Sequence, residues 1–214
     1  MPAADLIDAV IQDYDAVDPT DVDNSPLRAK YLRYLQQIYN YVWNIREWEW
    51  TYAETLINGN ANQDYLALPE TYLGMGQQGS LWNDSLRLRL YPKAKYFVER
   101  IRRENAQGSA VPIFGIWGGQ IQLSYVMTTP TPFRLFHRIL PETLTDDDTP
   151  FTIPNRWELV VLLPGLVWKS QTKKQDARPT WGQQFQAGLS QMAAAENPSQ
   201  HELLRMPVAV RRGW

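Results

Sequence analysis

The chain has 214 residues, enough for one large domain or two small ones, with 21 Lys and Arg, 23 Asp and Glu and no cysteine. The formal net charge of −2 argues against a protein that holds nucleic acid on a large basic surface, and the lack of cysteine excludes disulfides, thiolate metal sites and cysteine nucleophiles. The longest apolar run, residues 159–168, is shorter than the roughly 20 residues of a membrane-spanning helix, and early aspartates argue against a signal peptide.

The N-terminal part of the chain predicts two helices. Apolar residues recur at helical spacing over residues 3–17, and a proline after Asp18 predicts the end of the first helix there. Ser25 and Pro26 are typical of a helix start, because the serine can accept from first-turn amides and proline has the φ of the first helical position. Apolar residues then recur at steps of three and four, which predicts a second helix to about Arg46.

The middle of the chain predicts mostly strands. Trp48, Trp50 and Tyr52 alternate with polar residues, which predicts a strand with one aromatic face. Asn58-Gly59-Asn60 indicates a turn, and Gly118-Gly119 indicates the turn of a hairpin. Further strands are predicted at residues 65–69, 86–90, 113–125 and 133–140, with a short helix at 96–103 whose apolar face holds Phe97 and Ile101.

The C-terminal part predicts two helices and an arm. The helices are expected at residues 155–170, with a bend at Pro164, and at residues 181–195. The last residues are apolar and basic but carry a proline, so we expect an extended arm that docks on a partner. The candidate contact residues of this arm are Leu203, Leu204, Met206, Val208, Val210, Arg211, Arg212 and Trp214.

Helices followed by strands and then by helices indicate an α+β fold rather than a doubly wound parallel sheet. We expect the N-terminal and C-terminal helices, residues 1–47 and 154–197, to form a bundle. Residues 48–153 should form a central, mostly antiparallel β region, and residues 198–214 the extended C-terminal arm.

No pattern in the sequence predicts a catalytic residue, a cofactor site or a metal site. Residues 74–79, GMGQQG, have the letters of a dinucleotide-binding motif but lack the strand before it and the helix after it. The acidic residues 146–148 lack the alternating spacing of a calcium loop. His137 and His201 lie on different predicted elements without a Gly-x-Ser-x-Gly nucleophile elbow, so His137 is expected to be a structural strand histidine.

Two acidic residues leave an enzyme open as an alternative. Glu47 and Glu49 lie beside Trp48 and Trp50, and carboxyl groups at alternate strand positions are roughly 6–7 Å apart, near the range of inverting glycoside hydrolases. On a strand, however, these acids would face away from the tryptophan rings. A small-ligand binding module with an aromatic pocket is a further alternative.

A cluster of basic residues leaves nucleic-acid contact open. It consists of Arg87, Arg89, Arg100, Arg102 and Arg103. Glu99 and Glu104 lie among these arginines, which favours a surface of salt bridges or a face between subunits.

Four segments carry a resemblance in their order along the chain. They are WNIREWEW at residues 43–50, YLALPETY at residues 65–72, the strand pair around Tyr125 and Phe136, and LTDDDTPFTIPNRW at residues 144–157. Together they resemble the head-to-tail adaptor (connector) proteins of tailed bacteriophages, including the tail tubular protein A type. Another neck or tail component, such as a stopper or tail-completion protein, is the alternative.

The resemblance implies a non-enzymatic structural protein of the virion neck, between capsid and tail, without cofactor or membrane. It implies assembly in the host cytoplasm into a homo-oligomeric ring, usually of twelve copies, that contacts the portal protein and a downstream neck or tail protein. It also implies that the C-terminal arm inserts into the portal.

Such a ring would continue the DNA channel, and DNA would pass through its lumen without specific binding. We therefore expect negative charge to face the lumen, since carboxylates repel the DNA phosphates. The first 23 residues carry seven aspartates and no Lys or Arg. The candidates are Asp5, Asp8, Asp13, Asp15, Asp146, Asp147 and Asp148.

Overall fold

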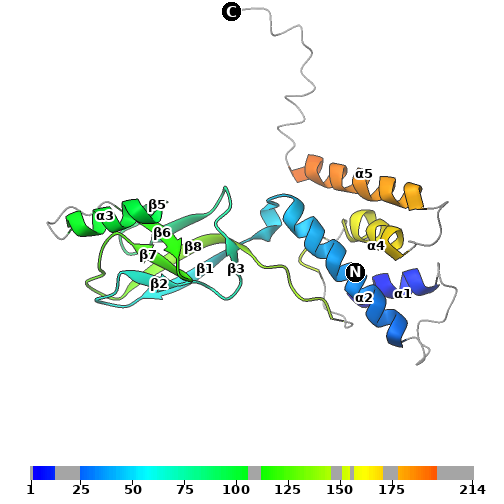
Figure 1. The fold of residues 1–214 in the computed structure, drawn as a ribbon, viewed down its shortest axis with the longest axis horizontal. Helices are drawn as coiled ribbons and strands as arrows, with labels where there is room; N and C mark the ends of the chain where they lie inside the picture. Colours follow the sequence, from blue (N-terminus) through cyan, green and yellow to red (C-terminus); the bar gives the residue numbers. More distant parts are fainter. Residues whose placement is uncertain are drawn as a thin grey trace, which may run out of the picture. The chain divides into compact units, whose positions relative to one another are not determined.

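The computed structural model describes residues 2–12, 25–105, 112–145, 151–154, 157–170 and 178–196, and its chain path is shown in Figure 1. The chain divides into two compact units. The helical unit comprises Met1–Trp50 and Pro141–Trp214, and the sheet unit comprises Thr51–Leu140. The fold is α+β, as the sequence predicts, with five α-helices and one large, mostly antiparallel sheet in the part of the chain that is described.

The helical unit contains four α-helices and a π-helical stretch. In chain order these are α1 (Ala3–Val10), α2 (Ser25–Ile45), η4 (Glu158–Leu162), α4 (Leu163–Ser170) and α5 (Arg178–Glu196). Helix α1 buries Leu6, Ile7 and Val10, as their spacing predicts. The π-helical stretch η4 ends two residues before Pro164, whose nitrogen lacks the hydrogen that would bond to the carbonyl of Val160 in an α-helix; the bend predicted at Pro164 stays a prediction.

Two glycines let the helices of this unit approach one another closely. A Cβ atom on Gly165 of α4 would lie 2.9 Å from Cγ2 of Ile38 on α2. A Cβ atom on Gly188 of α5 would lie 2.3 Å from the carbonyl oxygen of Val160 in η4. Helix α5 therefore packs directly on the backbone of η4, at a distance that only glycine permits.

The segment that follows α2 corrects one prediction. Residues 48–51 do not form a strand: Glu49–Thr51 is a short 3-10 turn, η3, and the first strand begins at Tyr52. The Trp48 indole N–H donates to the carbonyl of Val42 at 2.6 Å, and its ring stacks on that of Trp50 at 6.3 Å. The alternating tryptophans thus pack around the end of α2.

The sheet unit contains eight strands and one helix. These are β1 (Tyr52–Gly59), β2 (Tyr65–Ala67), β3 (Tyr72–Gly74), β4 (Ser80–Asn83), β5 (Leu88–Pro92), α3 (Lys95–Asn105), β6 (Ile113–Trp117), β7 (Gln120–Leu123) and β8 (Thr131–Ile139). The sheet order is β1-β8-β4-β5-β6-β7-β2, with β3 also paired to β8. Only the pair of β5 and β6 is parallel, and α3 connects these two strands.

The sheet curls around one apolar core, and its two edge strands, β1 and β2, contact each other. The core residues are Leu66, Leu81, Leu90, Phe114, Ile121, Leu123, Met127, Phe133 and Leu135. The strand predicted at residues 65–69 is β2, and it pairs with β7, a long-range partner that no local pattern predicts. The predicted helix over residues 96–103 is α3, but Val98 is its buried residue, while Phe97 is 51% exposed.

Candidate interaction surfaces

His137 is a structural residue of β8. Its side chain is fully buried, its Nε2 lies 3.0 Å from Oγ1 of Thr55, and its Nδ1 lies 3.0 Å from the carbonyl oxygen of Arg138. Both ring nitrogens therefore have partners inside the sheet unit. Within the described residues, no group of three or more His, Cys, Asp or Glu side chains could hold a metal ion.

The glycine-rich residues 74–79 connect two strands. Gly74 ends β3, Gly76 has a φ of 61°, and β4 begins at Ser80. A dinucleotide site needs a helix whose N-terminal amides face the pyrophosphate, and no helix begins here. The segment is a turn between β3 and β4; the strand before it corrects the sequence interpretation, whereas the helix that a dinucleotide site needs does not follow it.

Glu47 and Glu49 do not have the geometry on which the glycan-hydrolase alternative depends. They precede the first strand, so they are not at alternate positions of one strand. Glu49 is exposed, and its backbone N–H donates to Oε1 of Glu196 at the end of α5. This short turn instead links the end of α2 to the end of α5 within the helical unit.

Two of the five arginines of the cluster form ion pairs among the described residues. Arg100 pairs with Glu104 at 2.8 Å, and Arg102 pairs with Asp64 at 3.0 Å. The Arg102 guanidinium also donates to the carbonyl of Leu123 at 2.8 Å, which ties α3 to the end of β7. These contacts agree with the interpretation of the cluster as a surface of salt bridges.

The outward face of β1, β8 and β4 presents apolar side chains around one fixed arginine. Arg134 donates to Glu54 at 2.8 Å and to Asp84 at 2.9 Å. Its register partners, Leu56 on β1 and Trp82 on β4, are 64% and 39% exposed. We call Leu56, Trp82, Arg134 and the exposed Phe136 the outer-face patch. Aromatic and arginine side chains held in place in this way are typical anchors of protein interfaces.

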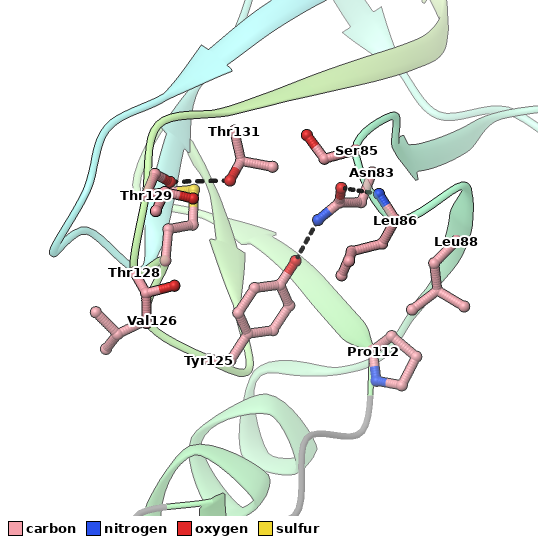
Figure 2. A pocket seen from close by; sticks show the side chains of 11 residues that line it. Asn83, Ser85, Leu86, Leu88, Pro112, Tyr125, Val126, Thr128, Thr129 and Thr131 are labelled. Atoms are coloured by element: carbon pink, nitrogen blue, oxygen red, sulfur yellow. Dashed lines mark hydrogen bonds between the residues drawn. The ribbon is translucent and has the colours of Figure 1, made fainter.

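A small pocket opens at the end of the sheet beside the residues shown in Figure 2. Its volume is about 290 Å³. The Nδ2 of Asn83 donates to the hydroxyl of Tyr125 at 3.2 Å, and the Oδ1 of Asn83 accepts from the N–H of Leu86 at 3.0 Å. Because Asn83 is engaged through both ends of its amide, the pocket offers mainly the apolar surface of residues such as Leu86 and Val126.

A larger cavity, of about 630 Å³, lies in the helical unit at the end of α5. Trp50 and Trp157 line it together with Glu49 and Glu196. We call these four residues the acidic aromatic pocket. These residues come from three distant parts of the chain, so no local pattern predicts the pocket; the paired Glu and Trp residues at 47–50 were the available signal.

The predicted site residues fall partly outside the described residues. Asp5 is exposed on α1, and Asp8 forms an ion pair with Arg28 of α2. The other lumen candidates, Asp13, Asp15, Asp146, Asp147 and Asp148, lie outside the described part of the chain. The same holds for the arm residues Leu203, Leu204, Met206, Val208, Val210, Arg211, Arg212 and Trp214. Their roles stay predictions.

Comparison with known protein families gives a match over nearly the whole chain. A family model described as SU10 adaptor protein matches residues 1–211, and so spans both units. No curated protein matches the chain. Among the helices that are described, none combines the length and the hydropathy needed to cross a membrane.

Proposed function

The chain belongs to the SU10 adaptor protein family, a family of phage head-to-tail adaptors, and on that premise we propose that it forms a ring beneath the portal. Family membership makes the protein a phage adaptor, a structural protein of the virion neck that interacts with portal and tail proteins. The proposed ring has about twelve copies and assembles in the host cytoplasm. Its role is mechanical and needs neither a catalytic residue nor a cofactor, and the similarity to the tail tubular protein A type stays a prediction.

The outer-face patch supports a contact between neighbouring copies. A closed ring requires a heterologous interface, in which one surface of each copy binds a different surface of the next. Leu56, Trp82 and Phe136 expose apolar area around Arg134, which is paired with Glu54 and Asp84. A neighbouring copy that covers this surface would bury the apolar area, while Arg134 keeps its two carboxylate partners.

The two units also differ in charge, which favours contact between unlike surfaces. The sheet unit contains nine Lys and Arg and six Asp and Glu. The helical unit contains the remaining twelve Lys and Arg and seventeen Asp and Glu. We propose that the sheet unit of one copy contacts the helical unit of the next, since opposite net charges attract and orient the partners.

In this proposal the C-terminal arm is the anchor on the portal, and the N-terminal aspartates face the DNA. Residues 203–214 contain apolar residues and three arginines without an acidic residue. Such a segment can bury apolar area in a cleft of a larger protein while its arginines pair with carboxylates. Aspartates toward the lumen would repel phosphate and let DNA slide through.

Cryo-electron microscopy of the virion neck tests the proposal directly. A ring of this chain directly beneath the portal, with residues 206–214 in portal clefts, is the expected result. Density lower in the tail would instead favour the stopper or tail-completion alternative. Absence of the chain from the particle would contradict any role in assembly.

A second test uses a variant that lacks residues 203–214. It should keep its circular dichroism spectrum and its thermal unfolding but lose co-purification with the portal. Normal attachment of this variant would show that the arm is not the anchor. Loss of folding would show that these residues belong to the core of the helical unit.

A further inference from the structure

The acidic aromatic pocket has the size and composition of a binding site. Its volume of about 630 Å³ is in the range of cavities that hold ligands. Two indole rings, of Trp50 and Trp157, lie beside two carboxyl groups, of Glu49 and Glu196. Indole faces and carboxylates both attract cations, so the combination selects a positively charged group.

Among the described residues, Arg46 is the cation whose charge affects the carboxyl group of Glu196. Burial raises the pKa of Glu196, the nearby Glu49 charge raises it further, and the N–H of Glu49 and the charge of Arg46 lower it. Arg46 is engaged elsewhere, because its guanidinium lies over the ring of Trp48 at 5.4 Å and donates to the carbonyl of Ala193 at 3.3 Å. A further cation in the pocket would therefore stabilise the ionised carboxylate.

The carboxylates require a cation in the ligand, and Trp50 adds the requirement for a hydrogen-bond acceptor. Its buried indole N–H has no hydrogen-bond partner among the described residues. The ring is held in place by a stacked contact with Trp48 at 6.3 Å and an edge contact with Trp43 at 4.9 Å. A buried donor of this kind is expensive to leave unpaired, so a small shift of the ring that lets an arriving carbonyl oxygen reach it would be favoured.

An arginine-bearing peptide meets both requirements, since its side chain supplies the cation and its backbone supplies the carbonyl. A metal ion or a simple amine would satisfy the carboxylates alone. We propose that the acidic aromatic pocket binds the C-terminal arm of the same chain, residues 203–214, and holds it until the arm engages the portal. The release of the arm on the portal rests on the proposed function, whereas the binding of the arm to the pocket does not.

The length and charge of the arm identify it as the occupant. The segment carries Arg205, Arg211 and Arg212 and no acidic residue. Only residues 197–204 separate Arg205 from Glu196, which itself lines the pocket. These residues can span up to about 26–29 Å, enough to turn back to the cavity. A tether of this length supplies an effective concentration on the order of millimolar, so even modest intrinsic affinity keeps the arm bound.

The absence of cysteine from the chain allows a sharp test on the full-length protein. Ala209→Cys creates a single thiol for a nitroxide spin label, and the indole N–H signals of ¹⁵N-labelled tryptophan report on the pocket by NMR. The nitroxide should broaden the Trp50 indole signal strongly. Trp50→Phe assigns that signal, and the circular dichroism spectrum of each variant reports that it is folded.

Two changes should release the arm. Glu196→Gln, and separately the combined change of Arg205, Arg211 and Arg212 to Gln, should lower the bound-to-free ratio of the arm about tenfold and restore the Trp50 signal. Glu70→Gln is the matched control, because Glu70 is an exposed carboxylate of the sheet unit and its loss should leave the broadening unchanged.

Two outcomes would overturn the proposal. The first is a Trp50 signal that stays sharp in the labelled protein, or stays broadened in both the Glu196 and the arginine variants. The second is a Trp50 signal that is broadened only when ¹⁵N-labelled copies without a spin label are mixed with spin-labelled copies without ¹⁵N. That result would show that the pocket binds the arm of a second copy. Since no portal is present, these results are independent of whether the truncated chain still attaches to it.

Discussion

Gln36 on α2 binds the backbone around Leu144 as a neighbouring strand would. Its Oε1 accepts from the N–H of Leu144 at 2.6 Å, and its Nε2 donates to the carbonyl of Glu142 at 3.1 Å. One side-chain amide thus supplies hydrogen-bond partners for two backbone groups of a segment that lies outside the sheet. This contact holds the segment that begins at Pro141 against α2, and so joins the two stretches of chain that form the helical unit.

Gln36→Ala should lower the free energy of unfolding by about 1–3 kcal/mol, because the amide group of Leu144 loses its partner. Gln37→Ala is the control, since the adjacent Gln37 is exposed on the same helix and its change should stay within about 0.5 kcal/mol. Urea unfolding followed by circular dichroism measures both. Equal effects of the two changes would contradict the importance of the contact.

Tyr39 should make stability fall in alkali. Its buried hydroxyl donates to Oε1 of Glu142 at 2.8 Å, and burial, followed by this carboxylate, raises the pKa of Tyr39 far above its ordinary value of 10.0. The unfolded chain releases the proton near pH 10 while the folded chain keeps it. The stabilisation is therefore complete below pH 10 and is lost as the pH rises toward the folded pKa.

Tyr39→Phe should accordingly flatten the decline in unfolding free energy between about pH 9 and 11, by up to about 1.4 kcal/mol per pH unit above the pKa of the unfolded chain. At neutral pH it should cost about 1–2 kcal/mol for the lost hydrogen bond. Tyr41→Phe, on the half-exposed Tyr41, should leave the slope unchanged. The same alkaline slope in wild type and Tyr39→Phe would refute the assignment.

Gly188→Ala should be among the most damaging single changes in the helical unit. The added Cβ would meet the Val160 carbonyl oxygen at 2.3 Å, and neither backbone can move without opening the contact of α5 with η4. We expect a loss of about 2–4 kcal/mol in thermal or urea unfolding. Gly74→Ala, where no atom lies within 4 Å of the added Cβ, should be close to neutral. A mild effect at Gly188 would mean that α5 shifts readily.

Arg102 should stabilise the sheet unit in a way that lysine cannot replace. Its forked guanidinium donates to the carbonyl of Leu123 and to Oε1 of Gln122, and it pairs with Asp64. Arg102→Met should cost about 2 kcal/mol, and Arg102→Lys should recover less than half of that loss, because an ammonium group lacks the fork. Arg103→Met, on the exposed neighbour, should have little effect. Full rescue by lysine would show that charge alone matters.

The outer-face patch should affect assembly rather than folding. Leu56→Arg places an unpaired charge at its centre, next to Arg134, and should abolish ring formation in the presence of portal, as seen by negative-stain microscopy. Leu86→Arg is the matched control, because Leu86 is 68% exposed on the rim of the smaller pocket. Rings that form normally from Leu56→Arg would place the interface elsewhere.

Local patterns in the sequence predict where helices and strands lie better than they predict which strands pair. The hairpin of β6 and β7 follows from Gly118 and Gly119, whose φ values of 62° and 73° suit a tight turn that few other residues allow. The parallel pairing of Tyr91 with Ile113 and the pairing of Leu66 with Ile121 are set by the shared core, which no local period encodes.

The wrongly predicted strand at residues 48–51 and the missed pocket have a common cause. Alternation of Trp48 and Trp50 resembles the period of a half-buried strand, but these rings pack on the end of α2. The same turn brings Glu49 to Glu196, a contact between residues at opposite ends of the chain. Only the folded helical unit brings these side chains into one cavity.

The pairing of β1 with β8 has a consequence for how this chain can vary. Tyr52, near the entry to the sheet unit, lies opposite Arg138, near its exit. An inserted module whose two ends are neighbours can lengthen, shrink or be exchanged without altering the path of the host around it. Replacement of Thr51–Leu140 by a short flexible linker should thus give a minimal protein made of the helical unit alone. The excised sheet unit can in turn be inserted into another protein.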